Sequence, residues 1–302
     1  MRRFARTPAA RIAAVAGLVA VMSFTILGAA AAADASTFSG VLRDRNGDPL
    51  PYQQLSLNGG GFTINGRTGA DGSFSLNAAP GLYTLQLNGG SPVLPPGQPT
   101  PLTIPTLPSS YMVSGVQIDL RDGDRQQDLR LPTLFLDVTA LNPAGQPLAN
   151  ALIELRQSFP GPAPMPPSPS INSQTELFPG GTGSVFYSSS KTSDANGHTR
   201  LALFAADNLA LALTGSGGQA LKQLGSLQGD SSTTIQALAS NRFSGVLRDR
   251  NGDPLPYQQM SLNGGGFTIN GRSGADGSFG LNAAPGLYTL QLNGGSTVFP
   301  PG

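Results

Sequence analysis

Short segments in which apolar side chains alternate with polar or small ones recur along the chain after residue 36. The clearest set lies in residues 38–88, where the segments are FSGVL, QQLSLN, FTINGR, SFSLN and LYTLQLN. A period of two, rich in Phe, Tyr, Ile, Val and Thr, is typical of strands that bury one face. After residue 36 the longest helical pattern is one turn at 219–224. The pattern therefore predicts an all-β protein.

Turn-forming residues separate these segments. Asn-Gly at 46–47 and Asp-Gly at 71–72 suit a backbone with positive φ, and Ala-Pro-Gly at 79–81 supplies a third reversal. Residues 116–120 and 128–131 then predict a closing hairpin. Seven short strands with a turn every eight to twelve residues are typical of a small antiparallel sandwich.

Residues 38–97 occur again as residues 243–302, without a gap and at an offset of 205. The two copies differ at five positions, Leu55/Met260, Thr68/Ser273, Ser75/Gly280, Pro92/Thr297 and Leu94/Phe299. The third unit reaches Pro300-Pro301-Gly302 without a counterpart of the closing strands. We expect the full protein to continue the alternation of domain types. The alternative is a genuine end that is completed by a strand from another molecule, because a sandwich without those strands exposes an edge.

The segment between the copies follows the same template with a different sequence. LFLDVTALNPAGQPLANALIEL at 134–155 repeats strand, turn and strand, residues 192–197 replace the second turn, and residues 226–238 mirror the closing strands. We predict a divergent sandwich, enlarged by a Pro-rich insertion at 159–170. We interpret the insertion as a stiff exposed loop, and a polyproline-binding partner is the alternative.

Three motifs carry a family resemblance. GVLRDRNGDPLPYQQLSL, RTGADGSFSL and APGLYTLQL resemble the signature of carboxypeptidase regulatory-like domains. The matching positions are Asp44, Gly47, Pro49 and Leu50, then Thr68, Asp71, Gly72 and Phe74, then Pro80, Gly81 and Tyr83. The chain departs from the pattern at Tyr52, where a small residue is usual. The resemblance implies tandem seven-stranded antiparallel β-sandwiches of the transthyretin-like, or prealbumin-like, type.

The first 35 residues have the order of a secretory signal peptide. Arg2, Arg3, Arg6 and Arg11 precede an apolar run that ends in small residues, and we expect cleavage after Ala33 or Ala35. The alternative is an uncleaved membrane anchor. The predicted domains are a signal peptide at 1–35, a regulatory-like sandwich at 37–132, the divergent sandwich at 133–240, and an incomplete copy of the first at 242–302.

Removal of the signal peptide changes the charge of the chain. It takes away four Arg and one Asp, which leaves 14 basic and 16 acidic side chains and a net charge of −2. Binding to nucleic acid loses its electrostatic basis, since phosphate contacts need a concentrated basic surface. The chain contains no Cys, so neither disulfides nor thiolate metal sites stabilise it.

Candidate catalytic groups are few. A zinc carboxypeptidase site needs two His and a Glu, whereas this chain has a single His, His198, in a turn-forming stretch. Glu154 and Glu176 are the only Glu, and we interpret Asp122, Asp124 and Asp128 as a solvated turn. Asp44-x-Asn46-x-Asp48 resembles the start of a calcium loop without its distal Glu, and GGGFTINGR at 264–272 lacks the Lys of a phosphate loop. We predict no catalytic residue, cofactor or metal.

Three function classes remain for a secreted or extracellular protein, with attachment to the cell surface as a further option. The first, which we favour, is a non-catalytic array of sandwiches that acts as a spacer or adhesive module for an extracellular protein or glycan. The second is a carbohydrate-binding module, for which Tyr52, Tyr111, Tyr187 and Tyr257 are the candidate aromatic platforms. The third is a set of accessory domains of an exported hydrolase whose catalytic part lies outside this chain.

Overall fold

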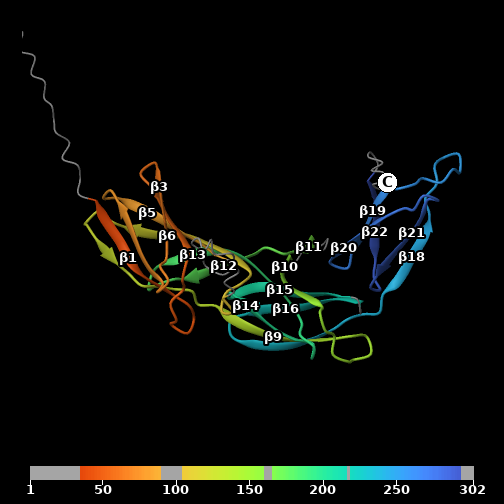
Figure 1. Ribbon diagram of the computed structural model, residues 1–302, viewed down its shortest axis with the longest axis horizontal. Helices are drawn as coiled ribbons and strands as arrows, with labels where there is room; N and C mark the ends of the chain where they lie inside the picture. Colours follow the sequence, from red (N-terminus) through yellow and green to blue (C-terminus); the bar gives the residue numbers. More distant parts are fainter. Residues whose placement is uncertain (1–34, 90–103, 160–164, 216–217, 294–302) are drawn as a thin grey trace, which may run out of the picture. The chain divides into compact units, whose positions relative to one another are not determined.

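The computed structural model describes residues 35–89, 104–159, 165–215 and 218–293, which form 22 β-strands and no α-helix (Figure 1). The all-β class predicted from the alternation is confirmed. No helix in the described ranges has the length and apolarity to cross a membrane. Residues 1–34 of the predicted signal peptide, residues 160–164 of the Pro-rich insertion and the exchanges at 92/297 and 94/299 lie outside the described residues.

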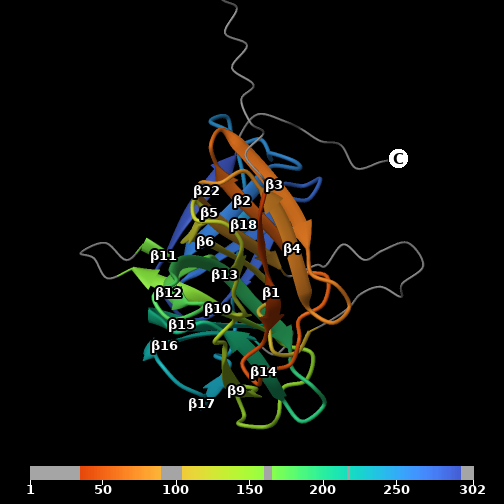
Figure 2. The ribbon, with the colours of Figure 1, turned by 90° about the vertical axis from the view of Figure 1, so that its left-hand side faces the viewer.

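Two sheets form the first sandwich (Figures 1 and 2). One sheet contains β4 (Ser73–Ala78), β1 (Ser36–Arg43) and the short strands β7 (Arg125–Gln126) and β8 (Leu129–Arg130), both of which pair with β1. The other contains, in spatial order, β3 (Phe62–Arg67), β2 (Gln54–Gly59), β5 (Leu82–Gly89) and β6 (Ser110–Asp119). The alternating apolar residues of both sheets face inward, and the Phe38 and Phe74 rings meet with centroids 5.1 Å apart.

The predicted closing hairpin at 116–131 is wrong. β6 pairs with β5 in one sheet, whereas β7 and β8 run parallel to β1 in the other. The turn between them therefore crosses from sheet to sheet, and this closes the sandwich. The alternation correctly predicts that Ile118 and Leu129 are buried. It determines which face of a strand is buried, but not which sheet the strand joins.

The second sandwich repeats the first strand for strand. One sheet has the order β14 (His198–Leu203), β9 (Leu134–Leu141) and β17 (Ser231–Gln236), with β17 parallel to β9 as β7 and β8 are to β1. The other has the order β13 (Thr182–Thr192), β10 (Leu152–Phe159), β15 (Ala206–Gly215) and β16 (Gly218–Leu227). The domain boundaries proposed from the sequence stay a prediction.

The Pro-rich insertion is only partly a loop. Within it, β11 (Met165–Ser168) pairs with β10, and β12 (Ile171–Glu176), which follows it, pairs with β13. The expectation of a stiff exposed loop through 159–170 is therefore wrong for residues 165–168. Proline is tolerated in such a strand because it lies at the edge of a sheet.

A hydroxyl group joins the same two turns in all three units. Thr68 Oγ1 donates to Leu50 O (2.7 Å) and accepts from Gln53 N–H (2.8 Å). Ser193 and Ser273 make the same pair of bonds in the second and third units, at distances of 2.6 to 3.0 Å. The predicted correspondence between residues 192–197 and the second turn of the repeat therefore holds in atomic detail. The hydroxyl explains why the repeats exchange Thr68 only for Ser.

Tyr52 departs from the family pattern at a position with unusual backbone geometry. Its φ is +58°, and the matching Asn150 and Tyr257 have φ of +55°. Asn adopts this left-handed region readily, whereas a ring-bearing residue is strained there. In the first unit the conformation is held by a bond from Tyr52 N–H to Thr68 O (3.2 Å). The three units thus share the backbone bend although they do not share the residue.

The third unit contains a two-stranded sheet of β18 (Asn241–Val246) and β21 (Ser278–Ala283), and a three-stranded sheet in the order β20 (Phe267–Arg272), β19 (Gln259–Gly264) and β22 (Tyr288–Asn293). These correspond to β1, β4, β3, β2 and β5 of the first unit. Within the described residues, no strand takes the places of β6, β7 and β8. The core is correspondingly small and centres on Met260, Leu262 and Leu281.

Candidate functional site

The first and second sandwiches are joined by their backbones. Ser184–Ser188 of β13 pairs antiparallel with Ser110–Ser114 of β6, so the two larger sheets form one sheet with the order β16-β15-β10-β13-β6-β5-β2-β3. The sequence predicted tandem sandwiches and gave no sign of a joint between them. In this pair, strand pairing continues across the boundary.

The length of β13 explains the join. β13 has 11 residues, whereas its counterparts β3 and β20 have 6 each. Its last residues, 189–192, pair with β10 inside the second sandwich. Its earlier residues pair instead with β12 on one side and with β6 on the other. The added length of β13 thus connects the second sandwich to the first.

Three aromatic side chains fill the core at this boundary. Tyr111 of β6 and Tyr187 of β13 lie directly opposite each other, and both rings pack edge-on against Phe204, with centroids 5.9 and 5.5 Å away. Tyr111 Oη donates to Gln53 Oε1 (2.9 Å), and Tyr187 Oη donates to Phe204 O (2.7 Å). Burial raises the pKa of both phenols above the ordinary value. One apolar core therefore runs through both sandwiches.

An ion pair closes the outer side of the boundary. The Arg45 guanidinium, in the first turn of the first sandwich, donates to both carboxylate oxygens of Asp230 (2.6 and 2.8 Å) and lies 4.6 Å from the centroid of the Phe135 ring. Asp230 also accepts the Phe135 N–H (2.9 Å). These bonds hold the pKa of Asp230 below its usual value, first through Arg45 and then through the backbone donor. The contact thus links the first turn of the first sandwich to Asp230 and Phe135 of the second.

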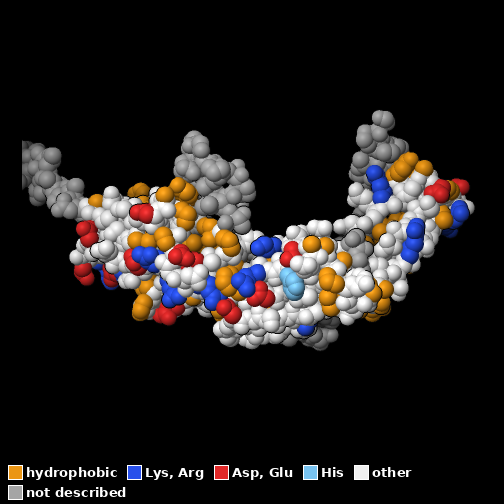
Figure 3. Space-filling model, turned by 60° about the horizontal axis from the view of Figure 1, so that its bottom comes forward, with side chains coloured by type: hydrophobic (Ala, Val, Ile, Leu, Met, Phe, Trp, Pro, Cys, Tyr) orange, Lys and Arg blue, Asp and Glu red, His pale blue; other side chains and the backbone are white. Residues whose placement is uncertain are grey.

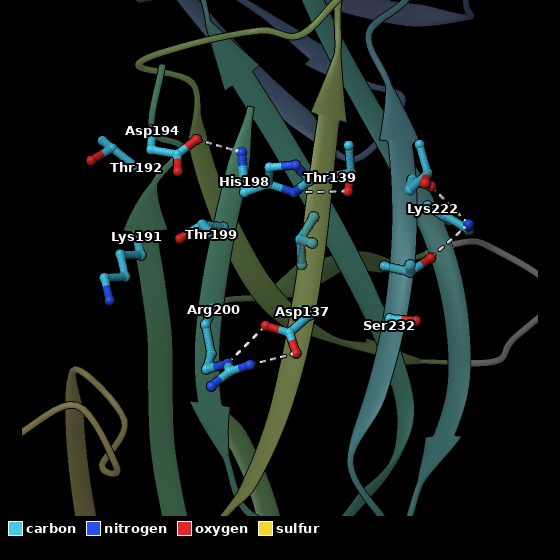
Figure 4. A pocket seen from close by; sticks show the side chains of 13 residues that line it. Asp137, Thr139, Lys191, Thr192, Asp194, His198, Thr199, Arg200, Lys222 and Ser232 are labelled. Atoms are coloured by element: carbon cyan, nitrogen blue, oxygen red, sulfur yellow. Dashed lines mark hydrogen bonds and ion pairs between the residues drawn. The ribbon is translucent and has the colours of Figure 1, made fainter. Parts of the chain in front are cut away.

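A shallow polar groove covers the outer face of β14, β9 and β17. Figure 4 shows its side chains, and Figure 3 shows the single His of the chain on the surface beside acidic and basic groups. Arg200 donates to both oxygens of Asp137 (2.7 and 3.0 Å), and Lys222 Nζ donates to Thr233 Oγ1 (2.7 Å). Arg200, Asp137 and Lys222 therefore already have partners within the protein.

His198 begins β14 on the floor of this groove and is exposed. Its Nδ1 shares a hydrogen bond with Thr139 Oγ1 (3.2 Å). Asp194, the carboxylate next to it in sequence, accepts the backbone N–H groups of Asn196 and His198 (2.9 and 2.8 Å) and serves the turn. A catalytic base needs a third group that orients it, and among the described residues Thr139 is the one side-chain hydrogen-bond partner of this imidazole.

Several carboxylates considered from the sequence have structural partners. Asp122, Asp124 and Asp128 are all exposed. Asp124 Oδ1 accepts Thr37 N–H (2.7 Å) and Asp128 Oδ1 accepts Val41 N–H (2.9 Å), so two carboxylates of the predicted solvated turn also link it to β1. Glu154 pairs with Arg156 at 2.6 Å, and Glu176 accepts the Gly180 N–H at 2.8 Å. The described ranges contain no group of three or more His, Cys, Asp or Glu placed to hold a metal ion.

The remaining motifs are turns. Asp44 Oδ1 accepts the N–H groups of Asn46 and Asp48 (2.8 and 2.9 Å), which accounts for the calcium-like spacing without a cation. In GGGFTINGR at 264–272, Gly265 and Gly266 form the hairpin turn between β19 and β20, and residues 267–272 are β20. Of the four candidate sugar platforms, Tyr111 and Tyr187 are buried at the boundary of the sandwiches, and Tyr52 and Tyr257 lie in the strained turns.

The sequence reading missed the boundary between the sandwiches. Phe204 was not singled out, and the two boundary tyrosines were considered as exposed platforms. The sequence carries little signal of it, because the apolar residues of TGSVFYSSSKT at 182–192 form one run, Val185-Phe186-Tyr187, and do not alternate. The strand that pairs with residues 184–188 lies 70 to 78 residues earlier in the chain.

No protein-family model matches the chain, and no curated protein matches it. The resemblance to carboxypeptidase regulatory-like domains therefore stays a prediction.

Several solved structures align with parts of this chain. The Bacillus anthracis TIE protein is 14% identical over 87% of this chain, with a TM-score of 0.24, and this chain covers 46% of that protein. A streptococcal ancillary pilin is 10% identical, with coverage of 87% and 96% and a TM-score of 0.26. The shaft pilin of Lactobacillus rhamnosus GG is 10% identical, with coverage of 70% and 99% and a TM-score of 0.30. At these values the similarity carries no argument about function.

Proposed function

We propose that the chain is a non-catalytic protein of the cell exterior, in which linked β-sandwiches act as a spacer and an adhesive or interaction array. The observation that carries the proposal is the β6–β13 pairing, with the shared core of Tyr111, Tyr187 and Phe204 beneath it. A sheet that continues from one sandwich into the next resists bending and separation at their boundary. Such resistance suits a protein that holds other groups away from a surface.

Mechanical unfolding of single molecules tests this role. When the chain is stretched from its ends, we expect the first two sandwiches to unfold in one event that releases roughly 70 nm, at about 0.36 nm per residue. The third unit should unfold separately and at lower force. Two successive events of about half that length would mean that the sandwiches bear load independently, and the spacer role would lose its basis.

A matched pair of variants isolates the boundary. Ser188 pairs with Ser110 of β6 and lies between the part of β13 that pairs with β12 and the part that pairs with β10. Ser188→Pro should split the joint unfolding event into two, because proline cannot donate to the ladder. Ser188→Ala removes only the Oγ contact with Ser110 (2.7 Å) and should leave the event single.

The carbohydrate-binding alternative stays a prediction with weaker support. Sugar sites usually present exposed aromatic faces, and two of the four candidate tyrosines are buried. Glycan-array binding that is lost in Tyr52→Ala and Tyr257→Ala would favour it over the spacer role. The accessory-domain alternative requires a catalytic part outside this chain. The extracellular protein or glycan partner and the location at the cell surface also stay proposals.

A further inference from the structure

The third unit exposes apolar side chains that the first unit buries. The pairs, at the offset of 205, are Phe38 (0% exposed) and Phe243 (44%), Leu85 (0%) and Leu290 (39%), and Leu87 (0%) and Leu292 (50%). The two units have the same strands in the same registers up to this point. The difference therefore comes from what covers these residues, and not from the residues themselves.

In the first unit the cover is a single segment, residues 110–131. Its strand β6 pairs with β5 along one open edge, and its strands β7 and β8 pair with β1 along the other. The buried side chains that it inserts between the sheets are Tyr111, Val113, Val116, Ile118, Leu120, Leu129 and Leu131. In the third unit, the edges of β22 and β18 that correspond to these two have no partner strand among the described residues.

Glycine at one position shows that the third unit can accept the same cover. A Cβ at Gly40 would lie 2.1 Å from Gln127 O, so the main chain of the covering segment passes too close to β1 for any side chain there. At the equivalent Gly245, the nearest atoms to a Cβ are those of the Phe279 ring, at 3.1 Å. The main chain of a covering segment can therefore approach β18 at Gly245, because no side chain blocks it there.

We propose that the third unit is a strand acceptor, which binds an extended segment with the apolar pattern of residues 110–131. The main chain of this segment would extend both sheets, and its alternating apolar side chains would fill the open core. We choose this apolar pattern because the first unit, whose sequence is almost identical, already binds the segment that has it. The proposal is independent of the spacer role, because it concerns the third unit alone.

The test uses the peptide SYMVSGVQIDLRDGDRQQDLRL, which reproduces residues 110–131, with a fluorescent label and the purified chain. We expect saturable binding by fluorescence anisotropy and slower amide hydrogen exchange in β18 and β22. Exchange in β1 and β5 should not change, since the first unit is already filled. A peptide with Ile118→Asp should bind at least about tenfold more weakly, because it would bury an unpaired carboxylate.

Variants of the protein assign the binding to the proposed surface. Gly245→Ala should weaken peptide binding at least about tenfold while the third unit stays folded, because only a side-chain ring has to move. Leu290→Asp should abolish binding by placing a charge in the core. Leu287→Asp is the matched control and should bind as the unchanged chain does, since Leu287 is 92% exposed and its equivalent Leu82 stays 52% exposed in the filled first unit.

Three results would overturn the proposal. The first is an absence of saturable binding to a chain whose third unit shows protected amides. The second is full binding by Gly245→Ala, which would place the peptide elsewhere. The third is self-association of the chain that Leu290→Asp abolishes while the peptide has no affinity, which would assign this edge to a second copy of the protein.

Discussion

Single residues in the two copies experience different surroundings although their sequences agree. Gly40 and Gly245 occupy the same position of the repeat, yet only Gly40 faces the main chain of a crossing segment. Gly47 and Gly252, in contrast, have φ of +91° and +92° with open space around them, so their requirement is set by the turn alone. Glycine is required at Gly40 by a tertiary contact, and at Gly47 by the local geometry of the turn.

Gly40→Ala should therefore destabilise the protein much more than Gly245→Ala. A new Cβ at Gly40 would meet Gln127 O at 2.1 Å, and backbone on both sides limits relief. We expect a loss of about 2 kcal/mol or more in the free energy of unfolding. Gly245→Ala should cost less than about 1 kcal/mol, as judged by urea denaturation followed by circular dichroism. Equal effects of the two substitutions would show that the contact with Gln127 does not form.

The positive φ of Gly47 could be predicted from the Asn-Gly pair, because that preference is local. The close approach at Gly40 could not, since it depends on a residue 87 positions later. The strained backbone of Tyr52 was marked only as a departure from a family pattern. Its cause became visible once Thr68 was seen to hold the bend in place.

At the scale of elements, the strands of residues 38–88 follow from the alternation, whereas their partners follow only in part. β2 and β3 are neighbours in sequence and pair across the two-residue turn Gly60-Gly61. The predicted hairpin failed for β6 with β7 and β8, where residues 120–124 cross between sheets. The pattern also gave no sign of the partner of β13, which lies in the other sandwich.

Phe204→Ala tests whether the two sandwiches share one core. Phe204 is fully buried and contacts a ring from each sandwich, so its removal should lower the free energy of unfolding by about 3–5 kcal/mol. Faster hydrogen exchange should appear both in β5 of the first sandwich and in β15 of the second. Phe243→Ala, at an exposed position of the third unit, serves as the control and should have a small effect. Exchange that rises in β15 alone would contradict a common core.

Acid should weaken the outer side of the boundary through Asp230. Because Arg45 lowers the pKa of Asp230 below 3.8, the ion pair stabilises the folded protein above that pH, and its contribution is lost as the pH falls through the lower, folded-state value. The pair is partly exposed, so the contribution is at most about 1 kcal/mol and decreases with salt. Asp230→Asn should remove this part of the pH dependence of stability, measured by urea denaturation between about pH 6 and 2. An unchanged pH dependence in the variant would exclude the contribution.

At the scale of the whole molecule, the two copies of the repeated sequence lie in cores of very different size. The ring pairs Phe38–Phe74 and Phe243–Phe279 are nearly the same, with centroids 5.1 and 5.4 Å apart. The first pair lies within a core that continues through two sandwiches, whereas the described core of the third unit is a small cluster around Met260, Leu262 and Leu281. Sequence identity predicted the same fold for both copies. It could not show that residues 110–131 cover the first copy, since the described residues of the third unit contain no counterpart.

The third unit should consequently open first. We expect amides of β19 and β22 to exchange faster than the equivalent amides of β2 and β5, by a factor of at least about 100, because the apolar area buried around them is smaller. Mass spectrometry of peptic fragments measures both sets in one sample, and the near-identical sequences give nearly equal intrinsic rates. Equal protection of the two copies would show that the exposed edge is covered in solution.

The pairing of β6 with β13 cannot form until both strands have emerged during synthesis. Ser110 and Ser188 are 78 residues apart, so a chain that emerges from its amino end presents β6 long before its second neighbour has appeared. During this interval the outer rim of β6 is an unoccupied template, and neighbouring nascent chains compete for it. Export conditions that keep newly emerged molecules apart should therefore favour the correct product.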